Sequence, residues 1–100
     1  MKMYIVVKEE VELGHAMVAV AHASLACYLK FQEHEDVGEW LAGPFFKAVC
    51  KVNEKEWERA AEAGDFVVMT ESALDGREVA MAFRPREEWP KAFRFFKLYR

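Results

Sequence analysis

Met3-Tyr4-Ile5-Val6-Val7 is a short, apolar and largely β-branched run near the start of the chain. It predicts a buried strand, central in its sheet and parallel to a neighbour, because strands covered on both faces are continuously apolar. The run from His15 to Phe31 contains neither Pro nor Gly, and its interior is almost entirely apolar. We expect a helix there, covered by other elements on much of its circumference.

The alanines of this helix form a pattern. Ala19, Ala23 and Ala26 follow the spacing i, i+4, i+7 and therefore share one face. Small side chains on one face allow a helix to lie close to a sheet.

The rest of the chain alternates helices and strands. Residues 37–41 favour a short second helix that ends at Gly43-Pro44, and residues 45–52 and 66–70 favour strands. Asn53 and Glu56 have the spacing of a capping box, which predicts a helix from there to a stop at Gly64.

Residues 78–84 predict a fourth strand, and Asp75-Gly76 favours a hairpin that makes it the antiparallel neighbour of the third. A terminal amphipathic helix is expected after Pro85 and Pro90. The order β-α-(α)-β-α-β-β-α predicts helices on both faces of a small mixed sheet, with the strand order left open.

Length and composition limit the possible classes of protein. One hundred residues, 53% of them apolar, predict a single domain over residues 1–100 with its own core. Two cysteines cannot form a disulfide framework, and no signal-peptide pattern opens the chain, so we expect a cytoplasmic protein. The long helix is too short, and too interrupted by His22, to span a membrane.

Charge is distributed unevenly along the chain. The net charge is −3. Residues 1–83 hold 8 Lys and Arg against 15 Asp and Glu, giving −7, whereas residues 84–100 hold 6 against 2, giving +4. Five aromatic residues are interleaved with the basic ones in this tail. Two interpretations stay open: the tail binds phosphates and bases of a nucleic acid, or its rings dock on the core and its charges face water.

Several short motifs, in register along nearly the whole chain, resemble those of the type 2 peptidyl-tRNA hydrolases. The first half of the chain is similar to the family in a strand end (Val6 to Val11), a turn glycine (Gly14) and an Ala-His-Ala helix motif (Ala21 to Ala23) followed by Tyr28-Leu29. The similarity continues in the second strand and the segments around it: Trp40, Gly43, Lys47 to Val52, Ala63-Gly64 and Pro85. The resemblance implies a three-layer α/β/α sandwich with a four-stranded mixed sheet. It also implies cleavage of the ester between a peptide and the 3′-terminal ribose of tRNA.

The chain also departs from the family pattern. The family has a lysine in its turn that is implicated in activity, and this chain has Leu13 near that position. His15 stands at the position of the family's second turn lysine, and Ala19 stands at the position of its helix glutamine. The acidic segment after the third strand is shortened, so only Glu71 or Asp75 could replace the family's acidic residue. The resemblance therefore implies the fold more strongly than the chemistry.

Ester hydrolysis needs a positioned water, a base and a donor to the developing oxyanion. We expect His22 to act as the base or to orient it, with Glu71 as its carboxylate partner. His15 and Gly14 could supply a proton donor and backbone N–H groups at the helix N-terminus. Lys8 could hold a phosphate, and the remaining candidates for substrate binding are Thr70 and Arg84.

The residues also allow less specific interpretations. His22 is alternatively a histidine satisfied inside an apolar helix. His15 and His22 stand roughly 10 Å apart along the axis, too far to share one metal, so no metal is expected. The sequence has no phosphate-binding glycine loop and no dinucleotide fingerprint, and no cofactor is expected. Cys27 and Cys50 are expected to be buried structural thiols.

Two other functions remain possible. The chain could be a catalytically silent family member that binds tRNA or a protein. It could also form a homodimer through exposed aromatics such as Trp40, Trp89 or Phe96.

Overall fold

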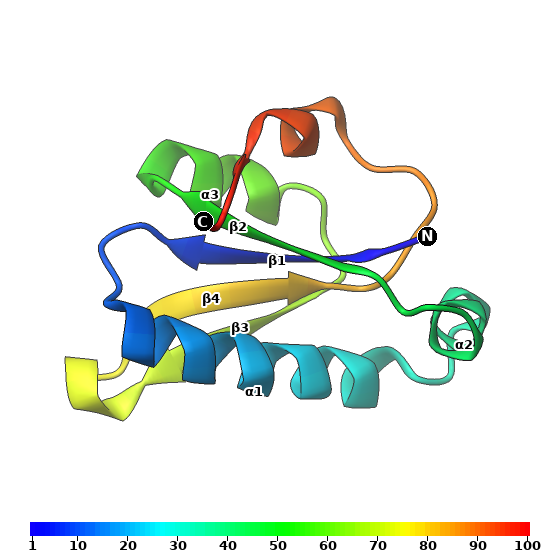
Figure 1. Ribbon diagram of the computed structural model, residues 1–100, viewed down its shortest axis with the longest axis horizontal. Helices are drawn as coiled ribbons and strands as arrows, with labels where there is room; N and C mark the ends of the chain where they lie inside the picture. The colour runs from blue at the N-terminus through cyan, green and yellow to red at the C-terminus, as the bar shows by residue number, and fades with distance from the viewer.

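The computed structural model describes residues 1–100 and has three α-helices and five strands (Figure 1). In chain order the elements are β1 Met3–Lys8, α1 Leu13–Phe31, α2 Glu35–Ala42, β2 Lys47–Val52, α3 Glu54–Ala61, β3 Phe66–Glu71, the 3₁₀ turn η1 Ser72–Leu74, β4 Arg77–Phe83, the 3₁₀ turn η2 Lys91–Phe95 and β5 Lys97–Leu98. No helix combines the length and hydropathy needed to cross a membrane.

The five strands form one mixed sheet in the order β3-β4-β1-β2-β5. β1 lies in the middle, parallel to β2 and antiparallel to β4, as its apolar run predicted. β3 and β4 are antiparallel neighbours, also as predicted. The expected α/β class is therefore confirmed, but the expected sheet of four strands is wrong, because β5 adds a fifth beside β2.

Alternating side chains of β1 face opposite sides of the sheet. Met3 and Ile5 pack under α1 in one cluster with Ala23 and Cys27. Tyr4 and Val6 point to the other side, into a cluster built from α3, the end of β4 and the C-terminal segment. Helices therefore cover both faces: α1 one face, α3 and η2 the other (Figure 1).

The alanine face of α1 packs on the sheet. Ala19 and Ala23 are buried as predicted, whereas Ala26 is only partly buried and Cys27 continues the buried stripe. The expectation that this helix is covered on much of its circumference is wrong. Its outer face has no covering element, because α2 and β2 lead the chain away from it (Figure 1).

The local signals around α3 and the hairpin are confirmed. The side chain of Asn53 accepts from the backbone N–H of Glu56 at 2.9 Å, and the Glu56 carboxylate accepts from the backbone N–H of Asn53 at 2.9 Å. Asp75 and Gly76 both have positive φ, 56° and 73°, which the turn into β4 requires.

The expected terminal helix is wrong. After Pro90 the chain makes the 3₁₀ turn η2, and then it extends into β5. Phe93 and Phe96, three residues apart, are buried at 1% and 7% exposure, a spacing that a 3₁₀ turn places on one side. The extended backbone at Phe96 then lets β5 pair with β2, so that the edge of the sheet is covered.

The rings of this segment pack on the core, which confirms the docking interpretation for Phe93 and Phe96. Of the three rings named for a homodimer contact, Trp40 and Phe96 are buried and are therefore not the exposed aromatics that this expectation assumed. Trp40 is 5% exposed and its indole N–H donates to the Phe46 carbonyl at 2.8 Å. Trp89 is partly buried, and its indole N–H donates to the Arg86 carbonyl.

Candidate functional site

Glu71, the last residue of β3, meets His15 in the first turn of α1. Glu71 Oε1 lies 3.6 Å from His15 Nδ1, at ion-pair distance. Its other oxygen, Oε2, accepts from the backbone N–H of Ala73 at 3.1 Å, and this contact fixes the carboxylate. The two side chains are partly exposed, 37% for His15 and 21% for Glu71. The carboxylate thus lies beside the imidazole, and water can still reach the pair.

Free backbone donors lie at the same place. The first hydrogen bond of α1 runs from the N–H of Ala16 to the carbonyl of Glu12. The N–H groups of Leu13, Gly14 and His15 therefore have no partner within the helix. Nothing lies within 4 Å of a Cβ placed on Gly14, so this end of the helix is open. Such an N-terminus favours a developing negative charge.

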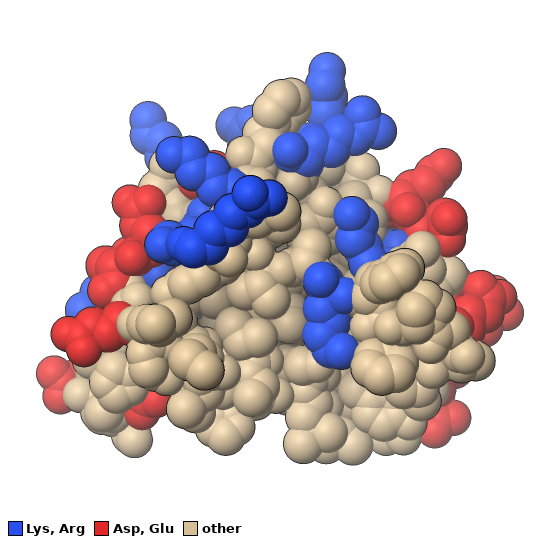
Figure 2. Space-filling model, in the orientation of Figure 1, with Lys and Arg blue, Asp and Glu red and all other residues tan.

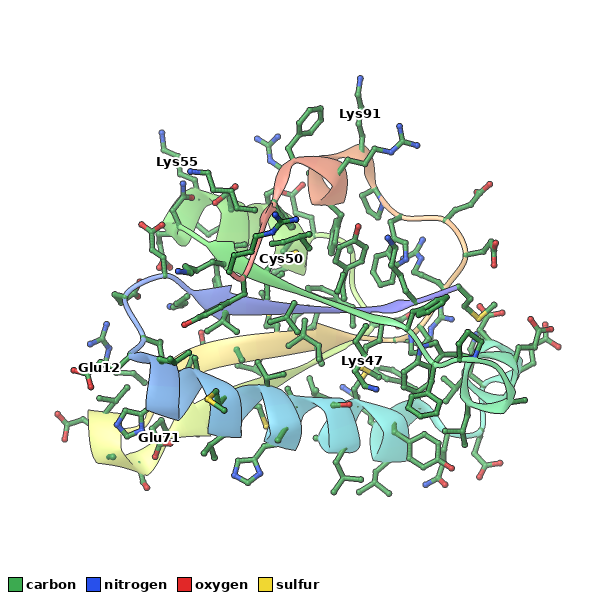
Figure 3. The ribbon with its side chains drawn as sticks, in the orientation of Figure 1. Glu12, Lys47, Cys50, Lys55, Glu71 and Lys91 are labelled. Carbon is green, nitrogen blue, oxygen red and sulfur yellow. The ribbon has the colours of Figure 1, made fainter.

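A cavity of about 150 Å³ adjoins His15. Charged side chains dominate its lining: Glu10, Glu12, Arg77 and Glu78. Figure 3 shows Glu12 and Glu71 beside the start of α1. The three carboxylates disfavour a phosphate in this cavity, so any phosphates of a ligand must approach from another side.

The structure does not bring His22 into this group. His22 is exposed on α1, seven residues after His15 and so about 10 Å further along the helix axis. The carboxylate of Glu71, which the sequence hypothesis assigned to His22, instead lies against His15. No hydrogen bond or ion pair engages the His22 ring. The interpretation of His22 as a satisfied core histidine is wrong, because the side chain is exposed.

The other predicted binding residues are dispersed. Thr70 is exposed on β3, and the pleat turns it away from its neighbour Glu71. Lys8 Nζ lies 3.4 Å from Glu54 Oε2 and 4.8 Å from the centre of the Trp57 ring, on the α3 side of the sheet.

Arg84 ties distant segments together instead of facing this cavity. Its Nη1 donates to Asp36 of α2 at 2.9 Å, and its Nε donates to Asp65 before β3 at 3.2 Å. Its side chain is 12% exposed. These contacts define a structural role for the guanidinium.

Arg77 is a site residue that sequence reasoning missed. It lies directly opposite Glu71 in the β3–β4 ladder and approaches Glu10 at 3.8 Å. The Asp75-Gly76 turn was the available signal, because a tight hairpin pairs the residues on either side of it.

Basic side chains gather on the opposite layer. Figure 2 shows Lys and Arg over α3, η2 and β5, above a largely uncharged region formed by α1. An open cleft of about 300 Å³ runs between α3 and η2, lined in part by Lys55, Arg59 and Phe95. The Phe95 ring is 71% exposed, and Lys51 Nζ lies 4.5 Å from the centre of the Tyr99 ring. Exposed rings among cations suit the stacking of bases between phosphates.

The two thiols are free and buried, as predicted. Burial raises the pKa of Cys27 to about 12 and that of Cys50 to about 11. Thiols held in the protonated form are poor nucleophiles, so neither cysteine suits catalysis. No group of three His, Cys, Asp or Glu side chains has the geometry to hold a metal ion.

Comparison with known proteins gives the family. Residues 1–85 match the family described as peptidyl-tRNA hydrolase PTH2. No curated protein matches the chain. Because the match spans most of the sequence and includes both β3 and the first turn of α1, the chain belongs to the peptidyl-tRNA hydrolase PTH2 family.

Proposed function

We propose that this chain hydrolyses the ester between a peptide and the 3′-terminal ribose of tRNA, with His15 and Glu71 as its reactive pair. The observation that carries the proposal is the 3.6 Å approach of Glu71 to His15 beside the open N-terminus of α1, in a member of this family. The helices on both faces of the sheet support the three-layer sandwich that the family resemblance implied.

The geometry suggests a role for each group. With its Nδ1 proton directed at Glu71, the His15 ring leaves Nε2 as a base that takes a proton from water. The water attacks the ester carbonyl, and the N–H groups of Leu13 and Gly14 stabilise the oxyanion. The tRNA ribose then leaves with a proton returned by the His15 imidazolium. Glu71 is favoured over Asp75 as the acidic residue because it is the one that contacts a histidine.

His22 was the base expected from the sequence, and its alanine variant is the control for the variant of His15. It lies on the same helix but has no carboxylate to orient it. The decisive experiment measures cleavage of N-blocked aminoacyl-tRNA by the wild type, His15→Ala and His22→Ala. We expect His15→Ala to lose roughly 100-fold or more in rate, and His22→Ala to change less than about twofold.

Two results would overturn this assignment. If His22→Ala loses activity and His15→Ala keeps it, the base is His22. If the wild type cleaves no faster than the reaction without protein, the chain is not a hydrolase.

We propose that tRNA binds across the basic surface of α3, η2 and β5. This surface reaches the start of α1, because Tyr99 of the C-terminal segment and Leu13 line the same groove. Binding of tRNA should weaken steeply with salt, because Lys and Arg side chains would contact its phosphates. Phe95→Ala should also weaken binding, because it removes an exposed stacking ring without changing the buried core. A flat salt response would exclude this surface as the tRNA site.

A catalytically silent member that binds tRNA or a protein is the second candidate. The observation that favours it is that two positions where the family resemblance places polar side chains hold apolar residues here. Leu13 is 61% exposed at the turn, and Ala19 is buried at 4% against Val79 and Ala80. Salt-dependent tRNA binding without any cleavage would support this candidate over the hydrolase.

A further inference from the structure

The cleft between α3 and η2 has a wall that lies outside the family match. The match ends at residue 85, whereas η2 begins at Lys91. The cleft has a volume of about 300 Å³, at the lower end of the range for sites that hold one small molecule. Its lining includes Lys55 and Arg59 from α3 and Phe95 from η2. The family pattern therefore does not account for this cleft.

The burial of its neighbours turns the Phe95 ring outward. Phe93 and Phe96 are 1% and 7% exposed, and the centres of their rings lie 5.0 Å apart. Because a 3₁₀ turn has three residues per turn, these two residues share the inner side and Phe95 faces water. The Phe95 ring is 71% exposed, more than any other large apolar side chain. An exposed ring in a concave surface is a platform for a flat aromatic ligand.

The charges of the cleft favour an anion beside that ring. Lys55 and Arg59 are four residues apart on α3, so they share one face of the helix, and both are exposed. Neither side chain forms an ion pair with the protein. The carboxylate in the lining, Glu56, accepts from the backbone N–H of Asn53 at 2.9 Å. Figure 3 shows Lys55 of α3 and Lys91 of η2 projecting away from the sheet. A ring among unpaired cations suits a nucleotide, which has a flat base and an anionic phosphate.

The topology of the sheet connects this cleft to the start of α1. β1 and β2 are parallel neighbours, so their carboxyl ends lie at one edge of the sheet. The chain leaves β1 for α1 on one face and leaves β2 for α3 on the other (Figure 1). Ligands of α/β proteins bind at such an edge, where successive connections turn to opposite faces. There the N–H of Glu9 donates to the carbonyl of Val52 at 2.9 Å, and the next residue, Asn53, lines the cleft. One ligand can therefore reach both the cleft and the open N-terminus of α1.

We propose that the cleft holds an unpaired nucleotide of the single-stranded 3′ end of tRNA, with its base stacked on Phe95 and its phosphate between Lys55 and Arg59. The inference rests on the proposed function, which places the ester carried by that same end at the start of α1. An unpaired base can leave its strand and present a face to the ring, whereas the bases of a duplex stack on one another. Because every base has such a face, the subsite should accept any of the four bases.

The test compares two RNA hairpins by fluorescence anisotropy, one with a short single-stranded 3′ overhang and one with a blunt end. We expect the wild type to bind the overhang hairpin at least about fivefold more tightly, because stacking of one base on a ring contributes on this scale. Phe95→Leu should remove this preference, whereas Phe95→Trp should keep it because a ring remains. Phe46→Leu is the matched control. The Phe46 ring is 63% exposed but lies before the amino end of β2, at the opposite edge of the sheet, so its loss should not change the preference.

The phosphate contact has its own measurement. Arg59→Gln should lower the slope of log affinity against log salt by about one for the overhang hairpin, because one phosphate contact is lost. An unchanged slope would overturn the role of Arg59. Circular dichroism checks that every variant is folded.

The outcomes separate this subsite from the proposed function. Equal binding of the two hairpins by the wild type overturns the subsite but leaves tRNA binding by the basic surface intact. A preference that Phe95→Leu retains, or that Phe46→Leu removes as well, overturns the stacking on Phe95. A chain that prefers the overhang but does not cleave N-blocked aminoacyl-tRNA has the subsite and is not a hydrolase. Failure to bind either hairpin overturns both the subsite and the tRNA surface.

Discussion

The carboxylate of Glu71 lies 3.6 Å from the imidazole of His15, although one residue ends β3 and the other begins α1. The contact exists because α1 packs across β3 and β4 and runs antiparallel to β3. Lys30 marks the other end of the same packing, where its Nζ donates to the Phe66 carbonyl at the start of β3. The packing of this long helix thus places the candidate base beside the end of β3.

Replacing Glu71 should show how much its carboxylate contributes to the cleavage rate. Glu71→Gln keeps the shape but removes the charge that holds the imidazole, so the rate of peptidyl-tRNA cleavage should fall roughly 10- to 100-fold. Asp75→Asn is the matched control, because Asp75 is exposed in the same hairpin and contacts no histidine. Single-turnover rates distinguish the two, and an equal loss in both variants would contradict the assignment of Glu71.

The packing of α1 on the sheet should be sensitive to side-chain size at Ala23. This residue is fully buried between Ile5 and Ala82, so Ala23→Leu should lower the free energy of unfolding by about 1–3 kcal/mol through overpacking. Ala42→Leu, at an exposed position of α2, should change it by less than about 0.5 kcal/mol. Urea denaturation measures both, and an unchanged midpoint for Ala23→Leu would contradict the close approach of helix and sheet.

Arg84 should matter for stability more than for tRNA binding. Arg84→Ala leaves Asp36 and Asp65 without their shared partner and should cost about 2 kcal/mol, because hydrogen bonds to charged groups are worth about 1.5–3 kcal/mol. Arg84→Lys should recover only part of this loss, since one ammonium cannot reproduce the forked contact. The exposed Arg94 is the control, and Arg94→Ala should leave the unfolding free energy unchanged while weakening tRNA binding.

The buried thiols should make the fold less stable at alkaline pH. Burial raises the pKa of Cys27 from 9.0 to about 12 and that of Cys50 from 9.0 to about 11. Above pH 9 the unfolded chain releases these protons and the folded chain retains them, so stability is complete below pH 9 and falls as the pH rises towards the folded pKa.

The expected loss at pH 10 is about 1 kcal/mol per thiol relative to pH 8. Denaturation curves at the two pH values measure it, and Cys27→Ala with Cys50→Ala should remove this part of the pH dependence. A double variant with the same pH dependence as the wild type would show that other groups account for the loss.

The local elements could be predicted from the sequence because short-range chemistry determines them. The apolar run of β1 requires burial on both faces, the side chains of Asn53 and Glu56 satisfy the first backbone groups of α3, and the Asp75-Gly76 turn requires positive φ. These features depend on neighbours a few residues away. The order of these elements predicted the α/β class, and the family resemblance, from motifs in register along the chain, implied the same class.

Only the tertiary structure decided which distant residues meet and which surfaces stay open. His22 and His15 share a helix, but the packing of β3 places Glu71 against His15. The apolar character of α1 predicted a covered helix, yet the chain provides only one layer against it and leaves Leu25 60% exposed. The spacing of the basic tail predicted a helix, but its last residues form β5, because β2 has an edge with which they can pair. Sequence periodicity encodes a residue's own conformation, whereas contacts and exposure depend on where the other elements pack.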